Sequence, residues 1–379
     1  MRVPHAELGW ANSLKFGKDI QGTMPGETRF GTVGHPSYTM EDAGQLAQVV
    51  HGTPDPQRLT LFSTMKNEMA FLPAWLAHHR EIGFEQFLIW DDASDDGSFE
   101  YLRDQQDCVV MHSDLSFGQE IHYCDPEGQS RLERVGTYFK IALPHLFFDG
   151  QFVGYVDADE FLILPPGVSS MAQVIDRLTA AQSPSAVASV VEFFPKDASG
   201  LQGEMPVDFD DLIAAYPYFE AEQLVQLVPG EQPMLMGQSK TARLFDHYEI
   251  KPKLERKGWH RIWMPKRAKK AQSFQKSPRH KTPLVRRDAQ SRLTGSHYGN
   301  LPPSPDVLLC VAHFVFTAQF ADKIDRATRW GAHANGASKY RYYRALLDAM
   351  QSGDGGFLGP NSQRFESAEQ LVTAGLMRW

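Results

Sequence analysis

Residues 58–91 read RLTLFSTMKNEMAFLPAWLAHHREIGFEQFLIWD, and this stretch predicts the fold of the chain. Its two short apolar runs, 59–65 and 87–90, are typical of buried strands. Between them Asn67 can cap a helix whose apolar residues recur on one face, and Gly83 can end that helix. A strand, a helix and a second strand in this order predict a βαβ unit with parallel strands.

The same alternation continues beyond this unit. A short helix near 99–105 precedes a third strand at 108–111, and a longer helix with apolar residues between 132 and 146 precedes a fourth strand at 152–156. Strands and helices at this spacing predict an α/β fold, a doubly wound and mostly parallel sheet covered by helices on both faces. Ligands of such sheets bind beyond the carboxyl ends of the strands.

The rest of the sequence is less regular and suggests four parts. Residues 1–57, rich in Gly, Pro, Thr and His, predict an irregular N-terminal arm, and residues 58–165 are the regular half described above. Residues 166–317 predict a second, irregular half with a basic insertion at 240–297. Residues 318–379 predict a C-terminal helical segment.

The composition is globular, but the charge is unevenly distributed. The chain has 379 residues, of which 42% are hydrophobic, and its 24 Phe and 7 Trp exclude wholesale disorder. Residues 240–297 contain 17 Lys and Arg against 4 Asp and Glu, although the whole chain has a net charge of -8. A basic tract in an acidic protein predicts an anionic partner, which could be a phosphate-bearing ligand, an anionic membrane surface or a nucleic acid. A solvated basic loop is the alternative.

Several features bear on the location of the protein. The sequence has no stretch of roughly 20 apolar residues, as a membrane helix requires, and its first residues lack the apolar block of a signal peptide. Three scattered cysteines (Cys108, Cys124 and Cys310) do not suit a disulfide framework or a structural zinc site. We expect a cytoplasmic protein whose basic tract, with its run at 266–270, can contact the inner face of a membrane. No nucleic-acid partner is expected, because no recognition module is visible.

The strongest chemical signal is the pair Asp157 and Asp159, which directly follows the strand at 152–156. Two carboxylates two residues apart at a strand end can reach one divalent cation, and hard oxygen ligands suit Mg²⁺ or Mn²⁺. An acidic turn is the alternative, since Asp-x-Asp is common by chance. The apolar strand before the pair and the following Glu160 and Phe161 favour a metal site.

Two other polar clusters follow predicted strands. Asp91, Asp92 and Asp95 lie on a tight loop, where a carboxylate can accept hydrogen bonds from a nucleobase or from ribose hydroxyls. Capping of the next helix is the alternative, whereas a calcium loop of the EF-hand type is excluded because a strand precedes it. The tripeptide Lys66-Asn67-Glu68 opens the first helix, either as its cap or as the lining of a ligand pocket.

Three residues further along the chain could also contact a ligand. Lys281 and His297 lie in the basic tract, which could close over a diphosphate and stabilise its charge. His313 lies in the apolar run 308–316, where a histidine is more often a core residue than a ligand. Taken alone, its position does not decide between the two.

Together these motifs resemble the family 2 glycosyltransferases, in the branch close to the family 92-like proteins, which have the GT-A fold. The resemblance covers 58–165 well and is looser beyond it. It rests on Lys66-Asn67-Glu68, the helix at 75–79, Gly83-Phe84, the loop 91–98 and the run 157–161, and then on 281–285, 295–297 and 312–314.

The resemblance implies residue roles. Residues 58–165 would bind a nucleotide sugar, and 166–317 would form the acceptor side. A UDP-sugar is expected, because most of the enzymes that the chain resembles use UDP. Asp157 and Asp159 would match the metal-binding Asp-x-Asp motif, and His313 the C-terminal histidine that completes metal or diphosphate contacts. The residues expected to bind the nucleotide sugar are Lys66, Asn67, Glu68, Asp91, Asp92, Asp95, Asp157, Lys281 and His297.

The implied activity is that of a metal-assisted, inverting, hexosyltransferase-like glycosyltransferase that transfers a sugar to a hydroxyl of a glycan or glycolipid. An inverting enzyme needs a carboxylate that deprotonates this hydroxyl. Asp197 is the first candidate, with Glu192 and Glu204 as alternatives. A nucleotidyltransferase is a second hypothesis, although residues 59–68 lack the glycine-rich loop that it predicts. A non-catalytic carbohydrate- or membrane-binding module is the third.

Overall fold

The computed structural model describes residues 34–250, 277–330, 334–353 and 355–379, and every structural statement below concerns these residues. Two units are distinguished, Met1–His35 and Pro36–Trp379, and the second contains all the elements described here. Most of the predicted N-terminal arm and the basic run at 266–270 lie outside the described residues.

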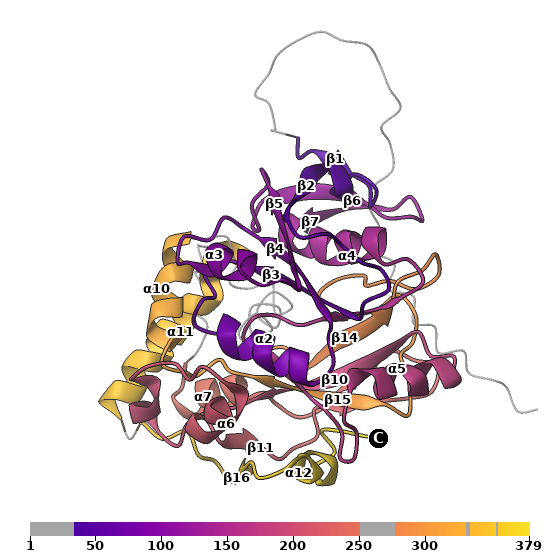
Figure 1. Ribbon diagram of the computed structural model, residues 1–379. Coiled ribbons are helices and arrows are strands. Elements are labelled where there is room, and N and C mark those ends of the chain that lie inside the picture. Colours follow the sequence, from indigo (N-terminus) through magenta and orange to yellow (C-terminus); the bar gives the residue numbers. More distant parts are fainter. Residues whose placement is uncertain (1–33, 251–276, 331–333, 354) are drawn as a thin grey trace, which may run out of the picture. The chain divides into compact units, whose positions relative to one another are not determined.

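One sheet organises the second unit. Its strand order is β2-β5-β4-β3-β8-β14-β10-β15-β9 (Figure 1). The strands are β2 (Ala47–His51), β3 (Thr60–Met65), β4 (Gln86–Asp91), β5 (Cys108–Ser113), β8 (Phe152–Tyr155), β9 (Glu160–Ile163), β10 (Ser185–Glu192), β14 (His280–Arg286) and β15 (Leu308–His313). The four strands predicted between residues 58 and 156 are therefore confirmed.

The sheet is mixed, which corrects the expectation of a mostly parallel one. Strands β3, β4, β5 and β8 are parallel neighbours, as the βαβ pattern predicts, and β10 is parallel to β15. Strand β14 is antiparallel to both β8 and β10, and β2 and β9 are antiparallel edge strands. The described part of the basic tract is thus no insertion, because β14 joins the two halves of the sheet.

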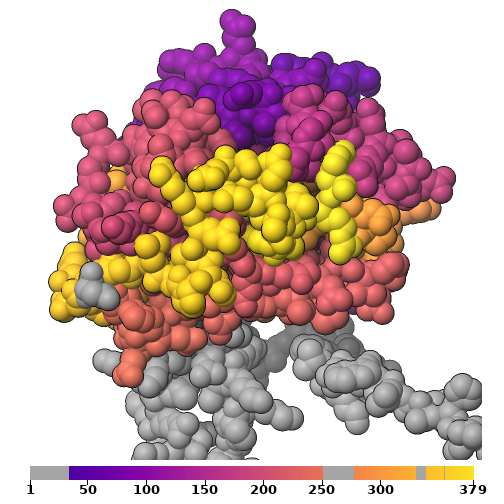
Figure 2. All heavy atoms as spheres, turned by 90° about the horizontal axis from the view of Figure 1, so that it is seen from below, coloured from indigo at the N-terminus to yellow at the C-terminus, as the bar shows by residue number. Residues whose placement is uncertain are grey.

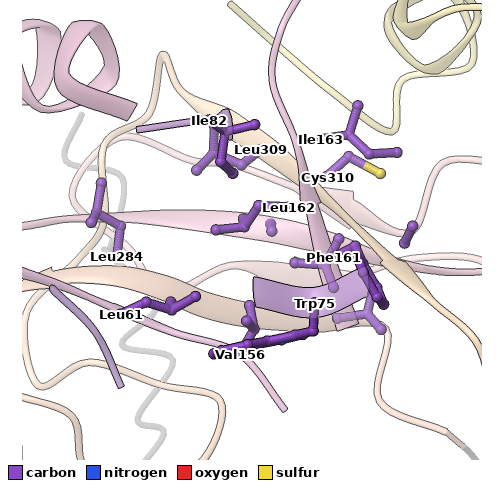
Figure 3. Packing of buried hydrophobic residues seen from close by; sticks show 14 of the residues in the cluster. Leu61, Trp75, Ile82, Val156, Phe161, Leu162, Ile163, Leu284, Leu309 and Cys310 are labelled. Carbon is purple, nitrogen blue, oxygen red and sulfur yellow. The ribbon is translucent and has the colours of Figure 1, made fainter. Parts of the chain in front are cut away.

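Helices α2 (Leu72–Glu81) and α4 (Val135–Phe147) cover opposite faces of the parallel half (Figure 1). Side chains alternate along a strand, so Leu61 of β3 packs in one core with Trp75 of α2, while the next residue, Phe62, packs in the other core with Phe139 of α4. Figure 3 shows part of the first core, including Trp75 and Phe161. This double cover explains why every residue of β3 and β4 is buried.

The remaining helices and short strands surround the sheet. The helices are α1 (Ala43–Leu46), α3 (Ser98–Arg103), α5 (Met171–Ala180), α6 (Phe209–Ala215), α7 (Lys240–His247), α10 (Phe320–Trp330), α11 (Ala334–Ser352) and α12 (Ala368–Thr373), with a 3₁₀ turn at Ala198–Leu201. The short strands are β1 (Ser37–Tyr38), β6 (Glu120–Cys124), β7 (Ser130–Arg134), β11 (Tyr218–Glu220), β12 (Val225–Gln226), β13 (Met234–Leu235) and β16 (Ser362–Arg364).

The C-terminal segment is tied to the middle of the chain. Helices α10 and α11 pack in a third core that includes Phe245 of α7, Phe320 of α10 and Tyr343 of α11. Strand β16 pairs with β11, and Arg378 exchanges two backbone hydrogen bonds with Leu308. Figure 2 shows the C-terminal residues (yellow) spread over residues from the middle of the chain. The predicted C-terminal helical segment is confirmed, and its α10 and α11 bring distant residues to the end of the sheet.

Gly154 tests how closely the sheet centre is packed. A methyl group at this position of β8 would lie 2.6 Å from the Phe84 ring and 2.7 Å from Leu61 Cδ1, and both side chains are buried. We expect Gly154→Ala to lower the free energy of unfolding by about 1–3 kcal/mol, because the core must shift to accept the methyl group. Urea unfolding measures this, with Gly295→Ala, which meets no atom within 4 Å, as control. Equal stability of the two variants would contradict the prediction.

Candidate functional site

A cavity of about 690 Å³ opens at the carboxyl ends of β3, β8 and β15. Its walls come from the segments that follow these strands, from the loop before α3, from the chain on either side of β14 and from α10 and α11. This is the position at which open α/β sheets bind ligands, and the volume suits a small organic ligand. Two of the three polar clusters predicted to converge at one edge of the sheet, 66–68 and 157–159, line this cavity, and the loop after β4 contributes Asp95. The predicted residues on the wall are Lys66, Asn67, Glu68, Asp95, Asp157, Asp159, His297 and His313.

Asp157 is surrounded by hydrogen-bond donors. Its Oδ1 accepts from the Tyr155 hydroxyl at 2.6 Å and from Lys140 Nζ at 3.2 Å, and its Oδ2 accepts from Lys281 Nζ at 2.9 Å. Burial favours the neutral acid, but the two lysines outweigh it and hold the pKa of Asp157 well below its usual range. Asp157 is therefore an anion at neutral pH, and protein cations already balance its charge.

Lys281 lies behind the cavity wall and has no solvent exposure. Its ammonium group binds both Asp157 and Glu160, and it lies 4.1 Å from the centre of the Tyr155 ring. Glu160 in turn accepts the backbone N–H of Asp157 at 2.9 Å. The geometry corrects the expectation that Lys281 faces the donor phosphates, since its position behind the wall makes it a support for the two carboxylates.

Asp159 is the second carboxylate at the end of β8, and it faces α10. Its Oδ2 accepts a hydrogen bond from Lys323 Nζ and lies 3.6 Å from His313 Nε2. Burial favours the neutral acid, but Lys323 and His313 outweigh it and hold the pKa of Asp159 far below its usual range. Burial also opposes the charged imidazole, yet Asp159 raises the pKa of His313.

Asp159 and His313 are the side chains best placed to hold a divalent metal. Asp159 Oδ2 and His313 Nε2 lie 3.6 Å apart, so that the carboxylate and the imidazole can share one ion. The described part of the chain contains no group of three or more His, Cys, Asp and Glu side chains that could hold a metal. Two protein ligands still suit Mg²⁺ or Mn²⁺, which take their other ligands from water and substrate phosphates.

Asn67 and Asp95 hold two loops together at the cavity mouth. Asn67 Nδ2 donates to Asp95 Oδ1 at 2.6 Å, and the Asp95 backbone N–H donates to Asn67 Oδ1 at 2.8 Å. Asn67 has a φ of 58°, in the left-handed region, so it does not cap α2, which begins at Leu72. The capping alternative is therefore wrong for Asn67, because its side chain bridges to the loop before α3.

Asp91 and Asp92 are buried behind the wall and do not line the cavity. The Asp91 carboxylate accepts hydrogen bonds from the backbone and the hydroxyl of Ser94 and lies 3.2 Å from His112 Nε2. Asp92 Oδ1 accepts from the Phe117 backbone N–H at 3.2 Å. These bonds fix the loop after β4, so the structure favours a supporting role over the predicted contact with a nucleoside.

His297 lines the cavity as a neutral imidazole. Burial, together with the charges of Lys281 and His280, lowers the pKa of His297 to about 3. Its Nδ1 lies 3.1 Å from the carbonyl oxygen of His280, which can only accept, so Nδ1 carries the proton. The other ring nitrogen, Nε2, is therefore an acceptor, which suits a ligand hydroxyl better than a phosphate oxygen.

None of the three predicted catalytic bases lies on the cavity wall. Asp197 accepts hydrogen bonds from Ser199 at the start of the 3₁₀ turn, and Glu204 is exposed. Glu192 is buried, and both its oxygens accept from Thr241, at 2.6 Å each, so it anchors the start of α7. The structure therefore argues against a base at these positions for a reaction in this cavity.

Several cations of the wall were not predicted from the sequence. Lys140, Lys323, Arg326, Arg329 and Lys339 line the cavity. No carboxylate of the described residues forms an ion pair with Arg326, Arg329 or Lys339, so that within this part of the chain the wall has an excess of positive charge. Two signals were available: Lys140 interrupts an otherwise apolar helix face, and Lys323 and Arg326 lie three residues apart, on one face of a helix.

Comparisons with known proteins add no relatives. The chain matches no protein-family model, and no curated protein matches it. Among the described residues, no helix is long and apolar enough to span a membrane.

Proposed function

We propose that this protein is an inverting glycosyltransferase that moves a sugar from a nucleotide sugar, in the first instance a UDP-sugar, to a hydroxyl of a glycan or glycolipid. The observation that carries the proposal is the cavity at the carboxyl ends of β3, β8 and β15, where Asp157, Asp159 and His313 meet a wall of cations. A donor with a diphosphate has the charge that this wall balances, and the position is the one at which α/β sheets bind nucleotides.

The cations of the wall would stabilise the leaving group. Cleavage of the bond between sugar and phosphate leaves negative charge on the nucleoside diphosphate, and fixed positive charges in a partly buried site lower the energy of that state. Arg326, Arg329 and Lys339 have no carboxylate partner among the described residues and are available for this role. His297 Nε2 would accept a hydrogen bond from a sugar or ribose hydroxyl.

Asp159 and His313 would hold Mn²⁺ or Mg²⁺ together with the donor diphosphate. The ion would supply Lewis-acid stabilisation of the departing diphosphate. Lys140 and Lys281 keep Asp157 ionised without any metal, so Asp157 remains an acceptor at the edge of the donor site.

The two alternative functions have weaker support. A nucleotidyltransferase is expected to cradle phosphates in a glycine-rich loop, and the residues between β3 and α2 contain no glycine. A binding module without catalysis does not require buried charges at the end of a strand. The basic run at 266–270, for which contact with the cytoplasmic face of a membrane was expected, lies outside the described residues. That contact therefore remains a prediction from the sequence.

A thermal-shift screen of UDP, GDP and their sugar derivatives, with and without Mn²⁺, tests the proposal. A nucleotide at a hundred times its Kd stabilises the folded protein by about 2.7 kcal/mol, which is measured as a raised Tm. We expect a UDP-sugar to raise the Tm most when Mn²⁺ is present, and Asp159→Asn to lose the part that depends on Mn²⁺. Asp306→Asn, at an exposed site, is the control.

The screen also separates the alternatives. A response to GDP and not to UDP would keep the site and change the donor. No response to any nucleotide would favour the binding module and would contradict the proposed function.

A further inference from the structure

Five carboxylates line the cavity, and four of them are already engaged by other side chains. The engaged groups are Asp95 with Asn67, Asp157 with Lys140, Lys281 and Tyr155, Asp159 with Lys323, and Glu160 with Lys281. Glu68 is the fifth, and its carboxylate forms no hydrogen bond or ion pair with the described residues. Of these five carboxylates, only that of Glu68 can exchange a proton with a ligand without breaking a bond to another described residue.

The backbone of Glu68 is fixed on both sides. Its N–H donates to the Ser98 hydroxyl at 3.1 Å, and its carbonyl accepts from the backbone N–H groups of Phe71 and Leu72 at 2.9 and 3.1 Å. The main chain therefore presents the half-buried Glu68 side chain to the cavity while leaving the carboxylate unbound. A catalytic group needs this combination of a rigid support and an uncommitted functional atom.

Burial and the charges around Glu68 place the pKa of its carboxylate close to neutral pH. Burial raises the pKa of Glu68 to about 7, because desolvation disfavours the anion. Lys323 and Arg326 of α10 oppose this effect, and Asp159 and Asp96 add to it. A general base is most effective when its pKa lies near the working pH, since it is then largely ionised and still a strong proton acceptor.

We propose that Glu68 is the general base of this site, and this inference rests on the proposed glycosyltransfer. The carboxylate takes the proton of the acceptor hydroxyl while the hydroxyl oxygen forms a bond to the anomeric carbon. The bond between that carbon and the phosphate oxygen breaks, and its electron pair leaves with the nucleoside diphosphate. Glu68 then releases the proton to solvent. This role replaces both the nucleoside contact implied by the resemblance and the base predicted at Asp197.

Glu68→Gln tests the proposal because it keeps the size of the side chain and removes its basicity. The acceptor is replaced by water, and the readout is release of UDP from the UDP-sugar that gives the largest thermal shift. We expect kcat to fall by about 10²–10⁴-fold, with the nucleotide-dependent Tm shift preserved. The wild-type kcat/KM should fall on acidification, because protonation removes the base, and the variant should lose this dependence. Asp197→Asn is the matched control and should retain wild-type kcat.

Azide provides a second readout that a structural role would not change. It is an anion that attacks carbon without losing a proton, so it bypasses the base. We expect Glu68→Gln to form the glycosyl azide at a rate close to that of the wild-type protein. Restored transfer to azide supports a role in proton transfer, whereas equally slow reactions with water and azide would overturn it.

The outcomes distinguish the two proposals. If the wild-type protein releases UDP and Glu68→Gln retains a kcat within about threefold of the wild-type value, Glu68 is not the general base. The proposed glycosyltransfer is then unaffected. Loss of kcat in Asp197→Asn instead of Glu68→Gln leads to the same conclusion. A wild-type protein that turns over no nucleotide sugar overturns both proposals.

Discussion

Lys281→Met is expected to lower the free energy of unfolding by about 3–5 kcal/mol, the usual cost of removing one partner from a buried ion pair. Lys281 has no solvent exposure and is bound to Asp157 and Glu160. Lys140 still balances Asp157 in the variant, but Glu160, which is 2% exposed, has no other ion-pair partner among the described residues. The loss therefore comes mainly from leaving a buried carboxylate uncompensated.

Urea unfolding measures this loss as a lower midpoint at an unchanged m-value. Arg286→Met is the matched control, since Arg286 ends the same strand and forms a partly exposed ion pair with Asp288 at 2.7 Å. Such a pair contributes about 0–1 kcal/mol. Adding Glu160→Gln to Lys281→Met should recover part of the stability, because the uncompensated charge is then removed. A change below about 1 kcal/mol for Lys281→Met would contradict this account.

Acidification from pH 7.5 to 5.5 is expected to destabilise the protein, because buried histidines must stay neutral in the folded state. Burial lowers the pKa of His78 and of His280 to about 4, and that of His297 to about 3. The unfolded chain binds these protons near pH 6.5, so below that pH the unfolded state holds more protons and stability falls. Each histidine contributes on the order of 1 kcal/mol of loss over this range.

Glu68 acts in the opposite direction, since its pKa is raised to about 7 and the folded protein takes up a proton first as the pH falls. Glu68→Gln should therefore make the loss of stability on acidification steeper. His78→Gln should make the dependence of the unfolding free energy on pH shallower, because about one proton fewer is taken up on unfolding. His247→Gln, at an exposed position, is the control. Unfolding midpoints in urea at pH 7.5, 6.5 and 5.5 measure these slopes. A stability that is constant or rises on acidification would contradict the prediction.

The local pattern of the sequence was sufficient to predict the strands and helices of the parallel half of the fold. Strands β3, β4, β5 and β8 and helices α2 and α4 follow from apolar runs and helical periodicity, because each is buried on a face set by its own spacing. Polar residues at the ends of these strands, such as Asp157 and Asp159, could be assigned to one edge since parallel strands end together.

The local pattern of the sequence could not predict which polar residues line the cavity and which support it from behind the wall. Asp91 and Asp159 both follow apolar strands, yet Asp91 binds Ser94 behind the wall while Asp159 faces Lys323 of α10. Lys281 reads as part of a solvated basic tract, but β14 carries it into the centre of the sheet. Which carboxylate stays unengaged depends on every neighbour at once, and no short stretch of sequence contains those neighbours.

The sequence by itself determined an α/β chain with acidic strand ends at a single edge, because hydrophobic periodicity and the direction of parallel strands are local properties. Only the tertiary structure decided the mixed order of the sheet, the lysines that balance Asp157 and Asp159, and the carboxylate of Glu68 that no other described residue engages. These depend on α10, α11 and β14, which reach the site through contacts between residues more than a hundred positions apart, such as Lys323 with Asp159 and Lys281 with Asp157. The energies of buried charges are set by such contacts and not by the residues adjacent in the chain.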